Sequence, residues 1–237
     1  MATGAKGKGA FAAQLIEQMK EQERRDKIER YKHLNRVARK GQILFCGSSL
    51  MEQFPVHELL VDAGLPLAVY NRGVGGYTTS ELIEMLDILV FELEPSHIFI
   101  NIGTNDMNEK DYRVENLMAQ YEEILTRIRQ VLPEVKFWLM AYYPCNKKVL
   151  SSDMMTAMHF RFRTNDRVRE ANEALKDLAG RFDAEYLDLN SGITDQEGEL
   201  KEEYAVDGIH MYGDGYMKVF EQLLPVLRKL AGQQEES

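Results

Sequence analysis

The stretch Ile43–Leu50 reads I-L-F-C-G-S-S-L and joins an apolar run to a small polar turn. Its first half, Ile43–Cys46, is short and apolar, as strands buried inside a parallel sheet are. Gly47 ends the run, and two serines follow it. Four later runs of similar character predict four more strands: Leu67–Tyr70, His97–Ile102, Lys136–Tyr142 and Glu185–Leu189.

Helical patterns lie between these runs. Apolar residues recur in steps of three and four over residues 80–90, 114–131, 168–178 and 216–230. Pro133 ends the second pattern, and Pro225 predicts a kink in the last. Strands that alternate with helices at this spacing predict an α/β fold, in which helices cover both faces of a parallel sheet.

The start of the chain differs from the rest in pattern and in charge. A thin apolar stripe from Phe11 to Val37 predicts a long helix that packs along the body or along a partner chain. Residues 1–40 hold 11 Lys and Arg against 5 Asp and Glu, whereas the remainder holds 18 against 33. We expect an N-terminal helical extension over 1–40, one catalytic domain over 41–232 and a disordered tail over 233–237. A homo-oligomer formed through the N-terminal helix is one expectation.

Composition limits the classes of function. The 237 residues suffice for one core, and a content of 44% hydrophobic and 28% charged residues is typical of a globular protein. The acidic body, within a net charge of −9, is a poor partner for phosphate backbones, so we expect no nucleic acid. The basic segment could bind nucleic acid or anionic lipid, but contact with the acidic body is the favoured alternative.

The apolar runs and the cysteines indicate the cellular location of the protein. No run reaches the roughly 20 apolar residues of a membrane span, and we expect no signal peptide. The two cysteines, Cys46 and Cys145, form no C-x-x-C pair and are too few for a disulfide scaffold. They favour a reducing, cytoplasmic setting.

Small and polar residues follow the predicted strands at the edge where open α/β sheets bind ligands. They are Gly47–Ser49, Asn71–Gly76 and Gly103–Asp106, with Asp207–His210 just before the last helix. Acyl transfer by a serine needs a nucleophile, a base, a group that orients the base, and donors for the oxyanion. These segments contain side chains of each kind.

Ser49 and His210 are the candidate nucleophile and base. A serine in a tight strand-to-helix turn exposes its hydroxyl, although Gly-Ser-Ser is more often only a turn and a helix cap. Asp207, three residues before His210, can reach one ring nitrogen and leave the other free to accept the serine proton. A surface Asp–His pair is the alternative reading of that spacing.

Gly76 and Asn105 are the candidate oxyanion donors. A glycine lets its backbone N–H approach a substrate without a side chain in the way. An asparagine amide offers an N–H from a rigid strand end. Each also has a structural explanation, a turn with positive φ for Gly76 and a loop-closing hydrogen bond for Asn105. The joint order Ser, Gly, Asn and Asp-x-x-His favours the catalytic reading.

In four blocks the sequence resembles the SGNH-hydrolase, or GDSL-type esterase, family. The blocks are F-C-G-S-S-L at Phe45–Leu50, N-R-G-V-G-G-Y-T at Asn71–Thr78, I-G-T-N-D at Ile102–Asp106 and D-G-I-H at Asp207–His210. The resemblance spans residues 42 to the final helix. The second and third blocks look most like the bacterial and platelet-activating-factor-acetylhydrolase-like branches.

The resemblance implies a three-layer, flavodoxin-like fold with strand order 2-1-3-4-5 and no metal or organic cofactor. It implies that Ser49 is the nucleophile and that His210 is the base, oriented by Asp207. It further implies an oxyanion hole made of the Ser49 and Gly76 backbone N–H groups and the Asn105 side chain.

One position departs from the family pattern: Ser48 precedes the nucleophile, where the family name implies aspartate. Met51 replaces the second glycine of G-x-S-x-G, which argues against the elbow of α/β-hydrolases.

Other chemistries fit less well. Gly73–Gly76 lacks the remaining residues of a phosphate loop, and the five histidines form no H-E-x-x-H motif, so we expect neither nucleotide nor metal. The connection 145–163 is rich in Met and Phe. A lid or an acyl pocket at the site would explain this, and so would packing onto the fourth strand or a subunit interface.

We therefore expect a carboxylic-ester hydrolase that acts on a small ester, with a short acyl group such as acetyl on a sugar or a lipid. Two alternatives stay open. One is acyl transfer to an acceptor other than water on the same fold. The other is a non-catalytic, flavodoxin-like module that binds partners through the basic N-terminal helix.

Overall fold

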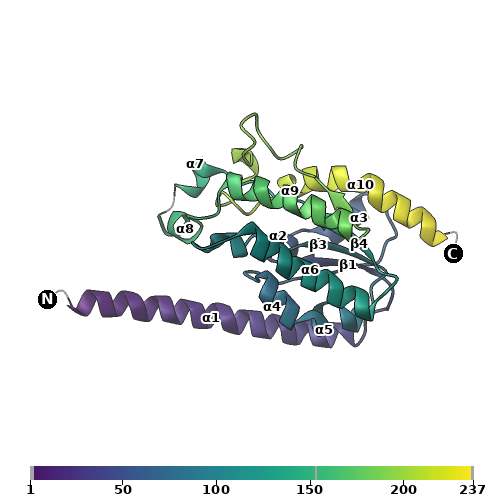
Figure 1. Ribbon diagram of the computed structural model, residues 1–237, viewed down its shortest axis with the longest axis horizontal. Coiled ribbons are helices and arrows are strands. Elements are labelled where there is room, and N and C mark those ends of the chain that lie inside the picture. The colour runs from purple at the N-terminus through teal and green to yellow at the C-terminus, as the bar shows by residue number, and fades with distance from the viewer. Residues whose placement is uncertain (1–2, 153, 236–237) are drawn as a thin grey trace. The chain divides into compact units, whose positions relative to one another are not determined.

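The computed structural model describes residues 3–152 and 154–235, and the chain divides into two units, residues 1–38 and 39–237. In the first unit, α1 is one helix, Thr3–Asn35 (Figure 1). Ion pairs one turn apart, such as Arg25–Glu21 at 3.2 Å, lie along it. Several of its apolar side chains are exposed: Leu15, Ile16, Met19 and Leu34.

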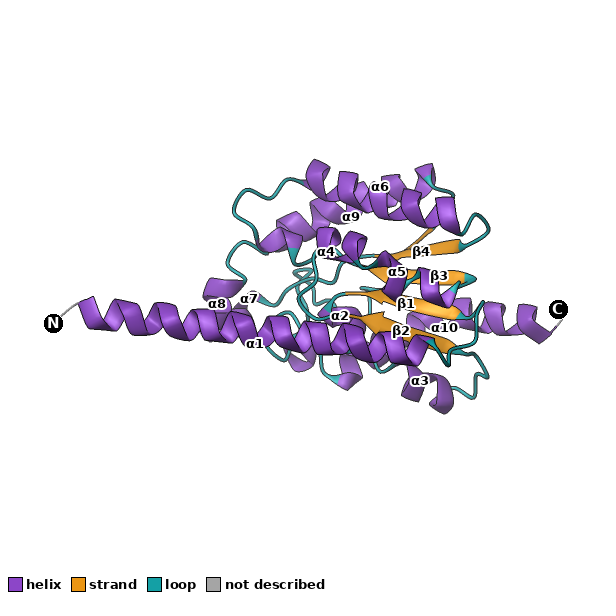
Figure 2. Ribbon diagram, turned by 90° about the horizontal axis from the view of Figure 1, so that it is seen from below, coloured by secondary structure: helices purple, strands orange, loops and turns teal. Residues whose placement is uncertain are grey.

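The second unit is built on one five-stranded sheet in the order β2-β1-β3-β4-β5, and every pairing is parallel. Figure 2 shows the strands side by side with helices around them. The strands are β1 (Ile43–Gly47), β2 (Val69–Gly73), β3 (His97–Asn101), β4 (Lys136–Met140) and β5 (Glu185–Leu187). The strand order expected from the family resemblance is confirmed.

Helices connect the strands and cover the sheet. The longer ones are α6 (Val114–Val131), α9 (Asn165–Arg181) and α10 (Gly213–Glu235). The shorter ones are α2 (Ser49–Glu52), α3 (Val56–Asp62), α4 (Thr79–Glu84), α5 (Leu86–Leu89), α7 (Lys147–Leu150) and α8 (Met154–His159). Three 3-10 turns complete the unit: Phe91–Leu93, Asp106–Asn108 and Glu202–Tyr204. No helix in the described part of the chain is long and apolar enough to cross a membrane.

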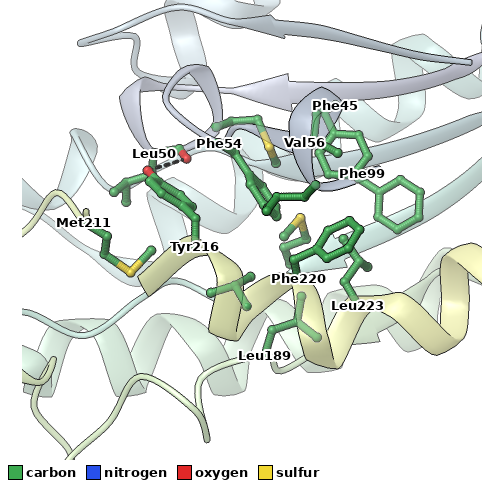
Figure 3. Close-up of a cluster of buried hydrophobic side chains, with 14 of the residues drawn as sticks. Phe45, Leu50, Phe54, Val56, Phe99, Leu189, Met211, Tyr216, Phe220 and Leu223 are labelled. Carbon is green, nitrogen blue, oxygen red and sulfur yellow. Dashed lines mark hydrogen bonds between the residues drawn. The ribbon is translucent and has the colours of Figure 1, made fainter. Parts of the chain in front are cut away.

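The core beneath α10 positions the Ser49 turn. Phe45 of β1 stacks on Phe99 of β3 at 4.8 Å, and Phe54 stacks on Tyr216 of α10 at 5.2 Å. Figure 3 shows the Tyr216 hydroxyl reaching the Leu50 carbonyl, to which it donates at 2.9 Å. Burial of aromatic groups of this size stabilises by about 1.5–3 kcal/mol each. The residue after Ser49 is therefore tied to the last helix of the fold.

The second strand begins later than the sequence pattern indicated, at Val69 instead of Leu67. Pro66, which has no N–H to donate, precedes it, and the pairing with β1 starts at Ile43↔Val69. The strand then takes in the polar Asn71, whose Nδ2 donates to the Met51 carbonyl at 2.7 Å.

Two helical regions also differ from expectation. The helix expected over 80–90 is two helices, α4 and α5, because the backbone at Met85 leaves the helical conformation, with φ −112° and ψ 11°. At the C-terminus, α10 runs from Gly213 to Glu235, whereas the apolar pattern indicated a helix over 216–230. Gln233–Glu235 are good helix formers, which explains the extension of the helix. Residues 236 and 237 of the expected tail lie outside the described residues.

Candidate active site

The candidate side chains meet at the carboxyl ends of the strands. β1 ends at Gly47 and leads to Ser49, β2 ends at Gly73 and leads to Gly76, and β3 leads to Asn105. Because all three strands are parallel, these turns lie at one edge of the sheet. The fourth segment, 207–210, precedes α10 and approaches the same turn.

Ser49, His210 and Asp207 form one chain of hydrogen bonds. Ser49 Oγ lies 2.8 Å from His210 Nε2, and His210 Nδ1 lies 2.7 Å from Asp207 Oδ2. The Asp207 carboxylate can only accept when it is ionised, so the Nδ1 atom carries the proton. His210 Nε2 is then the acceptor of the Ser49 hydroxyl, which is the arrangement required for a serine nucleophile and its base.

Hydrogen bonds from the His210 side chain and from the local backbone keep Asp207 ionised. Burial of the carboxyl opposes ionisation, but the His210 side chain and the backbone N–H groups of Ile209 and His210 all donate to it. Together these hydrogen bonds hold the pKa of Asp207 at about 2, below its ordinary value of 3.8. An ionised carboxylate in this place stabilises an imidazolium at His210.

Gly208 allows one short loop to carry both Asp207 and His210. Its φ is 91°, a conformation that costs other residues roughly 1–2 kcal/mol. A Cβ there would lie 2.6 Å from Leu150 N and 2.7 Å from Asn146 O. The Asn146 N–H in turn donates to the Gly208 carbonyl at 2.8 Å. The segment that leads into α7 thus holds the histidine loop in place.

The two candidate oxyanion donors lie on adjoining turns. Gly76 has a φ of 81°, and an ideal Cβ on the preceding Gly75 would lie 3.8 Å from Ser49 Cβ. Asn105 Nδ2 donates to the carbonyl of Tyr77 at 2.9 Å. The amide of Asn105 is therefore anchored to the residue that follows Gly76.

Sequence reasoning missed three side chains of this region. Glu52, one helical turn after Ser49, accepts the Gly75 N–H through Oε2 at 2.5 Å. Arg163 donates to Asn105 Oδ1 at 2.9 Å, and the ring of Phe160 lies 6.4 Å from the His210 ring, edge to face. Glu52 could have been found from its i+3 spacing to Ser49. The other two lie in a connection without any motif.

The connection 145–163, which precedes α9, contacts the candidate base through Phe160. Phe160 contacts His210, whereas Met154 and Met158 are exposed at 77% and 57%. The side chains of Asp153, Met155 and His159 lie outside the described residues. A lid function for this connection stays a prediction.

The two cysteines are buried and do not offer a second nucleophile. Burial raises the pKa of Cys46 to about 12 and that of Cys145 to about 11, so both are unreactive thiols. Among residues 3–152 and 154–235, no group of three or more His, Cys, Asp or Glu side chains is placed to hold a metal ion.

Comparison with known proteins identifies the family of the chain. The sequence model of the GDSL-like Lipase/Acylhydrolase family matches residues 47–218. That match covers most of the chain, so the chain belongs to this family and is a carboxylic-ester hydrolase. The resemblance seen in the four sequence blocks is confirmed.

Individual relatives place the chain within the family. Platelet-activating factor acetylhydrolase IB subunit alpha2 of Rattus norvegicus is 24% identical over 190 residues, 79% of this chain and 76% of that protein. A solved structure from Streptococcus pneumoniae, described provisionally as a platelet activating factor, is 31% identical with a TM-score of 0.82. The similarity covers 92% of this chain and 99% of that one.

A more distant neighbour shares the fold. An acetylxylan esterase from Geobacillus stearothermophilus is 15% identical, with a TM-score of 0.59 over 80% of this chain and 95% of that one.

Proposed function

We propose that this chain hydrolyses esters through an acyl-enzyme formed on Ser49, with His210 as base and Asp207 as its orienting carboxylate. The proposal is carried by one observation, the continuous hydrogen-bond chain from Ser49 Oγ through both ring nitrogens of His210 to Asp207 Oδ2. Acyl transfer by a serine needs a nucleophile, a base and a group that orients the base, and this chain of hydrogen bonds supports these three roles.

The steps follow from this geometry. Ser49 Oγ attacks the ester carbonyl carbon while its proton moves to His210 Nε2. The C–O bond to the alcohol then breaks, and His210 returns the proton to the leaving oxygen. A water repeats the sequence on the acyl-enzyme and releases the acid. Through both steps, Asp207 holds the Nδ1 proton and stabilises the charged ring.

The oxyanion of each tetrahedral intermediate needs donors. We assign them to the backbone N–H groups of Ser49 and Gly76 and to the Asn105 amide. Loss of one such donor typically lowers kcat by about 10²–10³-fold.

The test of the proposal is Ser49→Ala, with p-nitrophenyl acetate as substrate. The variant loses the nucleophile and keeps the fold, so kcat is expected to fall by about 10⁴–10⁶-fold with an unchanged circular dichroism spectrum. Ser48→Ala is the matched control, because the Ser48 hydroxyl is fully buried and has no partner among the described residues. Parental turnover by Ser49→Ala would exclude this mechanism.

For the substrate, we propose a short acyl group, such as acetyl, on a sugar or a lipid. Support comes from two relatives, an acetylhydrolase and an acetylxylan esterase, both named for acetyl groups. A series of p-nitrophenyl acetate, butyrate and octanoate tests the acyl length. We expect kcat/KM to be highest for acetate, and a maximum at octanoate would contradict the proposal.

We also propose a cytoplasmic location, which is supported by the two buried cysteines, both of them free.

A further inference from the structure

Arg163 is a buried cation that the mechanism above does not use. Its residue exposure is 5%, and it lies directly before Thr164, the N-cap of α9. Arginine is rarely buried unless it is paired, because its desolvation is costly. In the described part of the chain, both hydrogen-bond acceptors of its guanidinium are neutral: Asn105 Oδ1 at 2.9 Å and Asn108 Oδ1 at 3.1 Å.

The guanidinium stays charged at neutral pH. Burial lowers the pKa of Arg163 to about 10, against the opposing effects of Cys145, Asp207 and Asp106. A positive charge therefore lies against the carbonyl oxygen of the Asn105 side chain, whose amide nitrogen is a candidate oxyanion donor.

This charge determines which way the Asn105 amide faces. Asn105 Nδ2 donates to the Tyr77 carbonyl at 2.9 Å, while its Oδ1 accepts from Arg163 Nη2. If the amide were flipped, Asn105 Oδ1 would face the Tyr77 carbonyl oxygen and the Asn105 NH₂ group would face the Arg163 guanidinium. Both contacts would be repulsive. The Nδ2 atom carries a second N–H, which the bond to Tyr77 leaves available for a substrate oxygen.

The charge also strengthens that N–H as a donor. A hydrogen bond from an ionised donor is about twice as strong as a neutral one. Because hydrogen bonds in a chain polarise one another, withdrawal of electrons at Oδ1 makes the amide N–H a better donor.

Arg163 is itself fixed from a second side. Its guanidinium lies over the Phe160 ring at 4.9 Å, and the same ring contacts His210. Arg163 thus contacts both Asn105, the candidate oxyanion donor, and Phe160, which lies against the candidate base.

We propose that Arg163 is a positioning residue that orients and polarises the Asn105 amide, so that its free N–H faces the oxyanion of the transition state. The inference rests on the proposed function, since it requires Asn105 to act as an oxyanion donor.

A double-mutant cycle with p-nitrophenyl acetate tests it. We expect Asn105→Ala to lower kcat by about 10²–10³-fold. We expect Arg163→Met to lower kcat by about 10–100-fold, with KM within about threefold, because polarisation and orientation act on the transition state. In the Asn105→Ala background, Arg163→Met should cost less than about threefold, since a residue that acts through Asn105 has nothing left to orient.

Arg167 offers a matched control, one helical turn further on. Its guanidinium donates to the Met107 carbonyl at 2.9 Å and to the Glu109 carbonyl at 2.7 Å, in the loop that also holds Asn105 and Asn108. It anchors this loop without touching the Asn105 amide. Arg167→Met should therefore leave kcat within about threefold of the parent while it lowers the melting temperature.

Each outcome decides the question. If Arg163→Met lowers kcat by the same factor with and without Asn105, Arg163 acts by another route and the proposal is wrong. The same holds if Arg167→Met lowers kcat as much as Arg163→Met. If Arg163→Met is not recovered folded, Arg163→Lys, which keeps the charge and loses the planar fork, is measured against the same criterion, with about a tenfold loss expected.

The two proposals fail in different ways. Activity in Ser49→Ala would overturn the proposed function itself. An additive cycle together with an inactive Ser49→Ala would overturn only the role of Arg163.

Discussion

Asp207 and Asp106 are two aspartates close to the site, and their surroundings shift their pKa values in opposite directions. Asp207 accepts hydrogen bonds from His210 and from two backbone N–H groups, and its pKa falls to about 2. Asp106, which follows Asn105, accepts from the Thr79 N–H and hydroxyl, yet burial dominates and raises its pKa. The pKa of an aspartate is therefore lowered in the loop before α10 and raised after β3.

The difference teaches what burial and the neighbouring charge do. Asp207 is only half-buried and lies beside His210, so its hydrogen bonds outweigh the cost of burial and its pKa falls. Asp106 is more deeply buried and lies near Glu81, so burial outweighs the hydrogen bonds from Thr79 and its pKa rises. Asp207 contacts His210, whereas Asp106 contacts Thr79, so only Asp207 is placed for the proposed role of orienting the base.

The largest expected effect comes from neutralising each aspartate in turn. Asp207→Asn should lower kcat by about 10⁴-fold, because an amide no longer fixes the tautomer or stabilises the imidazolium. Asp106→Asn should stay within about threefold, since its carboxyl contacts Thr79 and not the triad. Steady-state kinetics on p-nitrophenyl acetate measures both. Similar losses in the two variants would remove the distinction.

The glycine in the Asp207–His210 loop gives the next effect, on stability. In Gly208→Ala, the new Cβ clashes with Leu150 N, and alanine is also strained at a φ of 91°. The two costs together should lower the free energy of unfolding by about 3–4 kcal/mol. Gly198→Ala, at a φ of 77° with no atom within 4 Å of the new Cβ, should cost about 1–2 kcal/mol. Urea unfolding compares the two, and equal losses would show that the contact with Leu150 is unimportant.

The contributions of the two aspartates to stability should change in opposite directions as the pH falls. Asp207 has a depressed pKa, so its contribution is present above about pH 4 and is lost as the pH falls toward 2. It amounts to about 2 kcal/mol. Asp106 has a raised pKa, so its contribution is present at low pH and is lost as the pH rises through the folded value.

The measurement is the difference in unfolding free energy between the parent and each Asn variant, from pH 2 to 6. For Asp207→Asn the difference should shrink as the pH falls, and for Asp106→Asn it should shrink as the pH rises. Slopes of the same sign would contradict the opposite pKa shifts.

Removal of residues 1–38 is expected to have the smallest effect. Both aspartates and all the candidate site residues lie in the second unit, so kcat and KM should stay within about twofold. Light scattering would show whether the oligomeric state changes, as the expected role of the helix in self-association predicts. Loss of activity in a folded truncation would show that the first unit takes part in the site.

Much of the fold could be predicted from local pattern. The apolar runs at Ile43–Cys46 and His97–Ile102 found β1 and β3 closely, because a strand buried on both faces is apolar throughout. The late start of β2 could not be found in this way. It depends on the pairing with β1, which lies more than 20 residues earlier in the sequence.

The site divides in the same manner. The short motifs of the sequence identify Ser49, Asp207 and His210. The three-residue spacing from Asp207 to His210 allows their side chains to meet, and the structure brings Ser49 to the same histidine. Arg163 lies 58 residues from Asn105, in a connection without a motif. The role that we propose for it rests on its burial and on its hydrogen bond to Asn105, and neither can be read from the sequence.

The central claim, that Ser49 is the nucleophile activated by His210, is tested most directly by covalent labelling. A fluorophosphonate probe reacts with a serine activated in this way. Intact-mass analysis followed by peptide mapping should find one adduct, on Ser49, in the parent protein, and none in Ser49→Ala. An adduct on another residue, or equal labelling of Ser49→Ala, would contradict the account.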